Sequence, residues 1–284
     1  MYTATIAVTL CGCAAAPLTQ GGSLSSYENL KPANGTVTKT LLRIDRDAVL
    51  AAKTAKILPA VFSAAALQVP FTDQQRRMIG NAVDRSLCVG LSDRFQMVAA
   101  WAPADLTVHA VITGITATDK VAAGASKVVS AIPAVLSLGV PVPVPRLPIG
   151  LGSLSVEAEA LGPGGEQQAA MIWALGANSI SNRPRVSTAS DAYELAGAFG
   201  GDFSQFLVTG KSPFGRLSAP SMQKISASLG SSPKYAACGA FGKNPGVRDM
   251  IAGGLGAPPE WTDDGAAKAG EPPPAAAPVA EVQH

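Results

Sequence analysis

The stretch SLSVEAEALGPGGEQQAAMIWAL, residues 153–175, decides the fold of this chain. Apolar and polar side chains alternate through its first nine residues, which is the two-residue period of a β-strand. The glycine-rich turn at 162–165 leads into a second apolar strand over 167–175, so the stretch predicts a β-hairpin. We expect the apolar side chains to face the core, and Glu157 and Glu159 to lie together on the opposite, wet face.

The best-marked helix of the chain runs from Thr72 to Phe95. Thr72 and Gln75 form a capping-box pair, in which each side chain satisfies a free backbone N–H of the first turn. Charged residues, Asp84 and Arg85 among them, fall largely on the faces away from the apolar stripe. That stripe repeats every four residues and predicts packing against a sheet: Ile79, Val83, Leu87, Leu91 and Phe95.

The sequence signals for the remaining helices and strands are weaker, but the order of these elements along the chain indicates the fold class. We expect strands over 36–45 and 106–116, an Ala-rich and mainly helical stretch up to Leu67, and helices over 188–208 and 222–229. This order predicts an α+β fold, a small, mostly antiparallel sheet with helices packed on one face.

Changes in composition divide the chain into four parts. Residues 1–20 form a signal peptide and tether, and 21–210 form an α/β domain. Residues 211–257, rich in Gly, Ser, Pro and Lys, form a C-terminal extension. The Pro- and Ala-rich residues 258–284 lack the apolar content that folding needs, so we expect a disordered tail.

An apolar insert, residues 121–152, separates two of the expected strands. Its prolines and its short uncharged run exclude a membrane-spanning helix, which needs about 20 continuous apolar residues. One interpretation is a long connection packed on the domain. The other is an exposed loop that binds a partner or touches a bilayer, because long loops with little regular structure are often functional.

The N-terminus carries the sequence Leu10-Cys11-Gly12-Cys13 after a short apolar run. It resembles the bacterial lipobox, and this resemblance implies lipid attachment at Cys13 after cleavage. A neutral Ala14 beside it favours the outer membrane, with the protein facing the periplasm. Several acyl chains on one cysteine anchor far more strongly than a single chain, since each buried methylene contributes ~0.8 kcal/mol.

This leader lacks the basic segment that opens a secretory signal, because no Lys or Arg precedes Lys31. We therefore expect translation to start upstream of Met1. The alternative is that residues 1–16 form an apolar strand with two incidental cysteines.

Composition narrows the possible partners. Apolar residues make up 47% of the 284, enough for a core, while only 15% are charged and the net charge is +2. Nucleic acid is excluded as a partner because phosphate binding needs clustered Lys and Arg.

Cys88 and Cys238 remain in the chain after the expected cleavage. In an oxidising periplasm they could form one disulfide. Cys88 also lies on a helix expected to be buried, where a free thiol is common, so both alternatives stay open.

Catalytic and metal-binding patterns are weak, and we expect no cofactor. His109 lies in a strand and His284 is the last residue, which disfavours zinc sites and Ser-His-Asp chemistry. Ser221 opens a Ser-x-x-Lys match without the motifs that accompany it in penicillin-recognising enzymes. Ser212 ends a partial phosphate-loop pattern that lacks its first glycine. Glu157 and Glu159, about 7 Å apart, could share acid–base work, but paired acids on a wet strand face usually serve solubility.

The order of two motifs resembles a bacterial lipoprotein family, domain of unknown function 3313. The stretch 22–30, GSLSSYENL, is similar to that family's G-F-L-S-D-Y-x-x-L opening, and 152–161, GSLSVEAEAL, to its V/I-E-A-E strand. Ser23, Ser26 and Gly162 depart from the family's usual Phe, Asp and Asp. The resemblance covers roughly 21–209. It implies a periplasm-facing α/β domain on a lipid anchor, and it assigns no catalytic residue.

Three functions remain open at this level. The first is a lipid-anchored binding or scaffold module that is not an enzyme and acts by contact with an envelope protein or with itself. The second is an envelope hydrolase with an unidentified active site. The third is an assembly subunit whose insert, residues 121–152, contacts the membrane.

Overall fold

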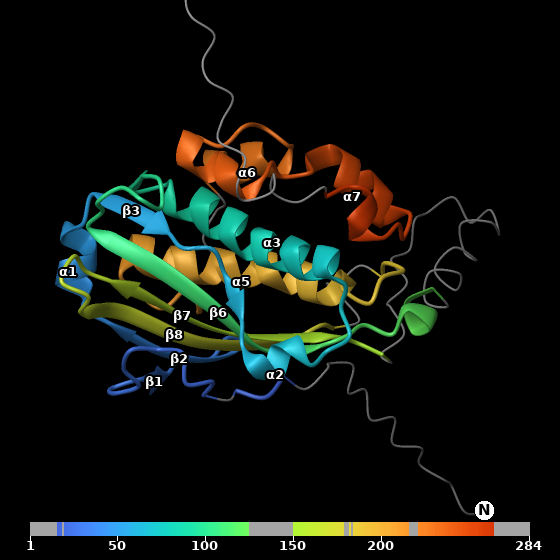
Figure 1. The fold of residues 1–284 in the computed structure, drawn as a ribbon, viewed down its shortest axis with the longest axis horizontal. Helices are drawn as coiled ribbons and strands as arrows, with labels where there is room; N and C mark the ends of the chain where they lie inside the picture. The colour runs from blue at the N-terminus through green and yellow to red at the C-terminus, as the bar shows by residue number, and fades with distance from the viewer. Residues whose placement is uncertain are drawn as a thin grey trace, which may run out of the picture.

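The computed structural model describes residues 16–18, 20–124, 150–178, 182, 184–215 and 221–263. One mixed sheet of eight strands forms the base of the molecule, and two long helices cover one of its faces (Figure 1). A further helical layer lies on those helices, and residues 16–30 lie on the opposite face of the sheet. The fold is therefore α+β, as the sequence predicts.

The sheet has the order β1-β2-β8-β7-β6-β3-β5, with β4 also paired to β6. Its centre, β2-β8-β7-β6, is antiparallel, while β3 and β4 run parallel to β6 and β5 runs parallel to β3. The strands are β1 (Lys31–Pro32), β2 (Lys39–Ile44), β3 (Thr54–Ile57), β4 (Val61–Phe62), β5 (Gln96–Met97), β6 (Leu106–Thr116), β7 (Ser153–Leu161) and β8 (Gln167–Gly176).

The hairpin predicted from residues 153–175 is β7 and β8. Val156 pairs with Trp173 and Glu157 pairs with Ile172 in its register. The Ala-rich stretch before Leu67 is only partly helical, because it also forms β3 and β4 beside β6. Pairing with a long central strand overrides the weak helix propensity of these short segments.

Helix α3 (Asp73–Leu91) has the predicted capping box, in which Thr72 accepts from Gln75 N and Gln75 accepts from Thr72 N. Its apolar stripe is fully buried against the sheet and α5 (Ser190–Thr209). A row of aromatic rings in contact joins β8 to α5. Its members are Trp173, Phe199, Phe203 and Phe206. The other helices are α1 (Arg46–Ala51), α2 (Ala64–Leu67), α6 (Met222–Ser228), η1 (Ala236–Phe241), α7 (Gly246–Gly254) and η2 (Pro259–Trp261).

Residues 221–263, which we name the C-terminal layer, pack on the outer side of α3. The predicted helix over 222–229 is α6. The predicted tail boundary at residue 258 is too early, because η2 is folded and Asp263 is buried. Residues 264–284 lie outside the described residues, as does the insert between 125 and 149.

Two charged residues of α3 are buried, although the sequence places them away from the apolar stripe. Asp84 accepts from Ala60 N before β4, and burial raises the pKa of its carboxyl to about 7. Arg85 forms an ion pair with Asp263 beneath the C-terminal layer. The helix is thus enclosed on both sides, which the sequence pattern does not reveal because the covering residues are distant.

Candidate functional site

The most developed polar site lies under the sheet, where Glu157 and Glu159 of β7 hold the N-terminal segment. The two side chains project from the same face of the strand, as predicted, but that face is not wet. Glu157 is fully buried and Glu159 is 4% exposed. The prediction of a solvated carboxylate pair is wrong because residues 16–30 fold back across this face.

Glu157 accepts hydrogen bonds from several donors of that segment. Gly21 N lies 2.6 Å from Oε1, and Ser23 N and Tyr27 Oη lie 3.0 and 2.7 Å from Oε2. The Ser23 hydroxyl donates to the same oxygen. Charge-assisted bonds of this kind are the strong ones, and together they satisfy a carboxylate that water cannot reach.

Glu159 repeats the arrangement two residues further along β7. Ser25 donates to Oε2 through its backbone N at 2.9 Å and its hydroxyl at 2.7 Å. Gln167 of β8 donates to the same oxygen at 2.8 Å and to Ser26 O at 3.0 Å. We call this set the glutamate clamp; its members are Gly21, Ser23, Ser25, Tyr27, Glu157, Glu159 and Gln167.

Apolar contacts seal the clamp on its β8 side. Leu24 packs on Ala170 and Ile172, with Leu18, Tyr27, Leu30 and Leu41 around them. Leu24, Tyr27 and Leu30 therefore lie in this second, smaller core. Burial raises the pKa of the Tyr27 phenol, and its bond to the Glu157 carboxylate adds to that rise.

A glycine is required where the segment crosses β6. A Cβ on Gly21 would lie 2.4 Å from Thr113 Cγ2 and 3.4 Å from Glu157 Oε2. The backbone can approach the two strands this closely only without a side chain.

The chain is already held on the sheet before the glutamate clamp, at Ala16 and Pro17. Pro17 O accepts from Ser155 Oγ at 3.0 Å, and Ala16 O accepts from Lys39 Nζ at 3.4 Å. Residues 16–18 and 20–26 are thus packed on the sheet and do not form the free tether expected after Cys13. Cys13 itself lies outside the described residues.

Of the other residues singled out in the sequence, only His109 lies beside this site. It is half-buried in β6 directly opposite Glu159, so its side chain is on the same face of the sheet as the clamp. Ser221 caps α6 by accepting from Lys224 N at 3.2 Å. Ser212 accepts from Phe214 N in an exposed turn.

Among the residues described, no group of three His, Cys, Asp or Glu could hold a metal ion. In the same residues, no helix is long and apolar enough to cross a membrane.

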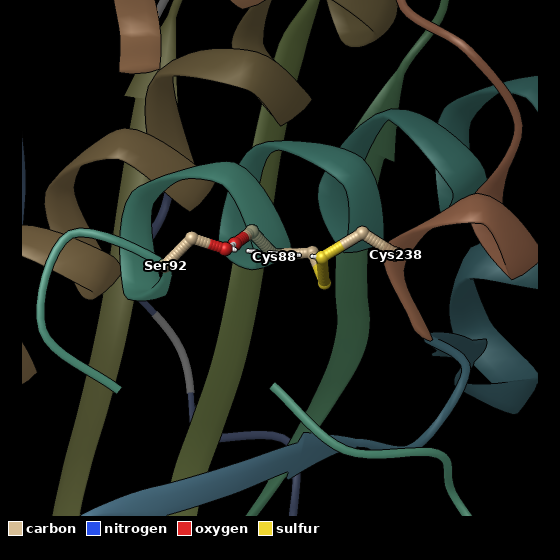
Figure 2. Close-up of a disulfide and its surroundings, with 3 residues drawn as sticks. All are labelled: Cys88, Ser92 and Cys238. Carbon is tan, nitrogen blue, oxygen red and sulfur yellow. Dashed lines mark hydrogen bonds between the residues drawn. A yellow bond between two sulfur atoms is a disulfide. The ribbon is translucent and has the colours of Figure 1, made fainter. Parts of the chain in front are cut away.

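Cys88 and Cys238 form a disulfide that joins α3 to η1, with their Cα atoms 5.7 Å apart (Figure 2). Ser92, one turn after Cys88, donates to Cys88 O at 2.6 Å beside the bond. Of the two alternatives that the sequence leaves open, the structure has the disulfide, which fastens the C-terminal layer to the domain.

The sequence did not reveal two buried arginines that hold the same layer. Arg85 contacts Asp263 and Phe241 O, while Arg185 contacts Asp249 at 2.8 Å and Ala257 O at 2.7 Å. Burial, with the neighbouring Asp263, raises the pKa of the Tyr193 phenol that bonds to Asp263. No spacing rule links these residues, since their partners are 64 to 178 positions away.

Comparison with known proteins gives a strong match to a family model and loose matches to solved structures. No curated protein matches this chain. A PelC dodecamer from Paraburkholderia phytofirmans aligns with a TM-score of 0.33 at 12% identity, covering 63% of this chain and 96% of that one. A variant PelC dodecamer from the same organism aligns with a TM-score of 0.30 at 12% identity, covering 61% and 93%.

The strong match is to a family model described as "Protein of unknown function (DUF3313)", over residues 19–203. That span contains every member of the glutamate clamp and ends before the C-terminal layer. Its two sequence motifs are the two halves of the clamp. The chain belongs to the DUF3313 family.

Proposed function

We propose that this protein is a lipid-anchored module of the bacterial cell envelope that acts through protein contacts and not as an enzyme. The single observation that carries the proposal is the glutamate clamp. The clamp holds the chain on the sheet from Gly21 onward, and bonds from Lys39 and Ser155 to Ala16 O and Pro17 O extend this packing back to Ala16. A lipid on Cys13 would then be separated from the packed domain by Ala14 and Ala15 alone.

Such a short connection suits a protein whose position relative to the membrane matters. A free tether of a dozen residues would let the domain diffuse through a wide volume. A packed segment held by two buried carboxylates instead keeps the domain close to its anchor and limits its orientation. This is the property expected of a scaffold or assembly component.

The proposal of a non-catalytic role is supported by the state of the polar residues. Glu157 and Glu159 are occupied by donors of the chain itself, so neither is free to transfer a proton to a substrate. Ser221 is engaged as a helix cap. A hydrolase that used the residues singled out in the sequence would have to break one of these arrangements first.

The second candidate is an assembly subunit whose insert contacts the membrane. The described ends of the insert, 121–124 and 150–152, both lie where β6 ends and β7 begins, next to the place where Ala16 is packed. A lipid anchor and an apolar insert leaving from one end of the domain could act on the same bilayer.

The anchor is tested by metabolic labelling with a palmitate analogue. We expect label on the wild-type protein and its loss in Cys13→Ala, with retention in the matched variant Cys11→Ala. Label that persists in Cys13→Ala would overturn the anchor.

The scaffold role is tested by crosslinking in intact envelopes. We expect a specific partner, or a second copy, to be captured with the wild-type protein. Capture of neither would remove the protein-contact role, and deletion of 125–148 would separate contacts made by the insert from those made by the domain.

A further inference from the structure

One end of the domain collects several features that point toward a lipid surface. It is the end where β6 finishes and β7 starts, marked by the pair Thr116 and Ser153. Ala16 is packed at the same end, because the neighbouring Pro17 accepts from Ser155, two residues into β7. We call this the anchor end.

The reach of the chain limits how far the anchor end can be from a membrane. Three residue steps separate Cys13 from Ala16, and an extended chain spans at most about 3.6 Å per residue, or roughly 11 Å in all. Given the lipid on Cys13 that we propose above, the anchor end must lie within that distance of the lipid.

The anchor end also exposes large apolar side chains, which we call the apolar end patch. It comprises residues from four separate segments that meet there. Val186 N donates to Gly256 O at 3.0 Å, and a Cβ on Gly124 would touch Val186. Figure 1 shows α7 and the short green helical turn at 120–124 toward the same side of the molecule. Its members are Val121, Val186, Ile251, Leu255 and Trp261.

Trp261 is tied to this end through its neighbour. Glu260 accepts from Gln75 in the first turn of α3 at 2.8 Å, and also from Ser187. Trp261 is 68% exposed and Leu255 is 77% exposed. Tryptophan is enriched where protein meets the headgroup level of a bilayer, because its ring is apolar and its N–H is polar.

The charges around the patch complement an anionic surface. Lys120 and Arg248 are exposed beside it. Two nearby acids are occupied internally, since Asp249 pairs with Arg185 and Glu260 accepts from Gln75 and Ser187, while the exposed Asp119 caps Val121 N. An apolar face with basic residues at its border is the pattern of segments that lie at a membrane surface.

We propose that the apolar end patch rests on the headgroup and acyl boundary of the bilayer that holds the Cys13 lipid. The domain would then stand with its strands pointing toward the membrane and the opposite end, near β5, pointing away. This inference rests on the proposed lipid anchor and adds an orientation to it.

Two native tryptophans make the test direct. Trp261 lies in the patch, whereas Trp101, 89% exposed, lies between β5 and β6 at the other end of the sheet, and Trp173 is buried. The lipidated protein is reconstituted in phosphatidylethanolamine–phosphatidylglycerol vesicles with brominated acyl chains, which quench tryptophan at short range. The variants Trp101→Phe and Trp261→Phe isolate the two ends.

We expect bromolipid to quench the emission of Trp101→Phe by at least a third, and to leave that of Trp261→Phe unchanged. Ile251→Ser with Leu255→Ser, made in the Trp101→Phe background, should reduce the quenching at least twofold. The matched control is Met222→Ser, which removes an equally exposed apolar side chain from α6 and should change nothing.

Each failure has its own meaning. If palmitate label is present on Cys13 and Trp261 is quenched no more than Trp101, the orientation is wrong while the anchor stands. If quenching is unaffected by the double substitution, the patch is not the contact. If no label is found on Cys13, the proposed anchor itself fails. Circular dichroism of each variant confirms that these exposed substitutions leave the fold intact.

Discussion

The first and last segments that the structure describes cover opposite sides of the domain, and they are held by different chemistry. The N-terminal segment lies on the sheet through hydrogen bonds to two carboxylates of one strand. The C-terminal layer lies on α3 through a disulfide and two ion pairs. The first region lies within the match to the family from residue 19 onward, and the second lies entirely outside it.

The difference follows from what each region can bury. The N-terminal segment adds Leu24 and Tyr27 to an apolar patch on β8, so its polar bonds act beside a small core. In the C-terminal layer, α6 buries only Ala227 and α7 only two glycines, so that η1 supplies the main apolar contact through Cys238 and Phe241. A layer with so little apolar burial needs covalent and ionic fastening, because hydrophobic contact supplies most of the stability elsewhere. Substitutions in one region at a time can separate attachment by carboxylate hydrogen bonds from attachment by the disulfide and ion pairs.

The largest effect should come from the disulfide. Cys88→Ser with Cys238→Ser opens a loop of 150 residues, which is worth about 5 kcal/mol in the chain-entropy estimate. We expect the C-terminal layer to detach first, seen as faster hydrogen exchange in 221–263 with protection retained in β7 and β8. Equal loss of protection in the sheet would show that the layer is part of one cooperative unit with it.

Next in size is the removal of a clamp carboxylate. Glu157→Ala leaves Gly21 N, Ser23 N and the Tyr27 hydroxyl without their acceptor, and we expect a loss of about 3 kcal/mol in urea unfolding. The matched variant Glu159→Ala, which orphans fewer donors, should cost less. Hydrogen exchange should then rise in residues 20–27 and not in the C-terminal layer. The reverse pattern would contradict the division between the regions.

A third test uses a carboxylate that belongs to neither region. Burial raises the pKa of Asp84 to about 7, so the folded protein holds a proton that the unfolded chain has already released above pH 4. Raising the pH from 5.5 to 7.5 should therefore lower the free energy of unfolding by about 2 kcal/mol through this group. Asp84→Asn should remove that slope. A slope that persists in the variant would assign it to other groups.

The smallest expected effect concerns the close approach at Gly21. Gly21→Ala places a methyl group against Thr113 and should cost about 1–2 kcal/mol by overpacking. The control Gly197→Ala, in an open position of α5, should instead stabilise by up to about 1 kcal/mol, as Ala does in a helix. Stabilisation by both variants would mean that the segment is not held tightly on β6.

Sequence reasoning succeeded where a signal is local. The period-two pattern of 153–175, the capping box at Thr72 and the four-residue stripe of α3 each depend on neighbours in the chain. They gave the hairpin, the main helix and the fold class. The motif resemblance also identified the family, because each half of the glutamate clamp contains a short motif that can be recognised in the sequence.

It failed where the partner is far away in the chain. Alternation alone cannot tell a wet strand face from one covered by another segment, so Glu157 and Glu159 were assigned to solvent. Asp84 and Arg85 were misplaced for the same reason. Asp263 sits in a Pro-rich context that suggests disorder, yet its carboxylate meets Arg85, 178 residues earlier. The glutamate clamp was therefore visible as two motifs but not as one site.

The clamp also sets an order of events during synthesis. Ser23 and Ser25 are made early, but their acceptors in β7 come 134 residues later. Contacts so distant along the chain cannot form until the intervening chain has been made and closed into a loop. If the chain is exported and lipidated as we propose, the N-terminal segment remains unpaired with β7 during export, and Cys13 is accessible for processing at that stage. Once the sheet is complete, the segment packs on it. Folding would then shorten the free connection between the lipid and the domain after the lipid has been attached.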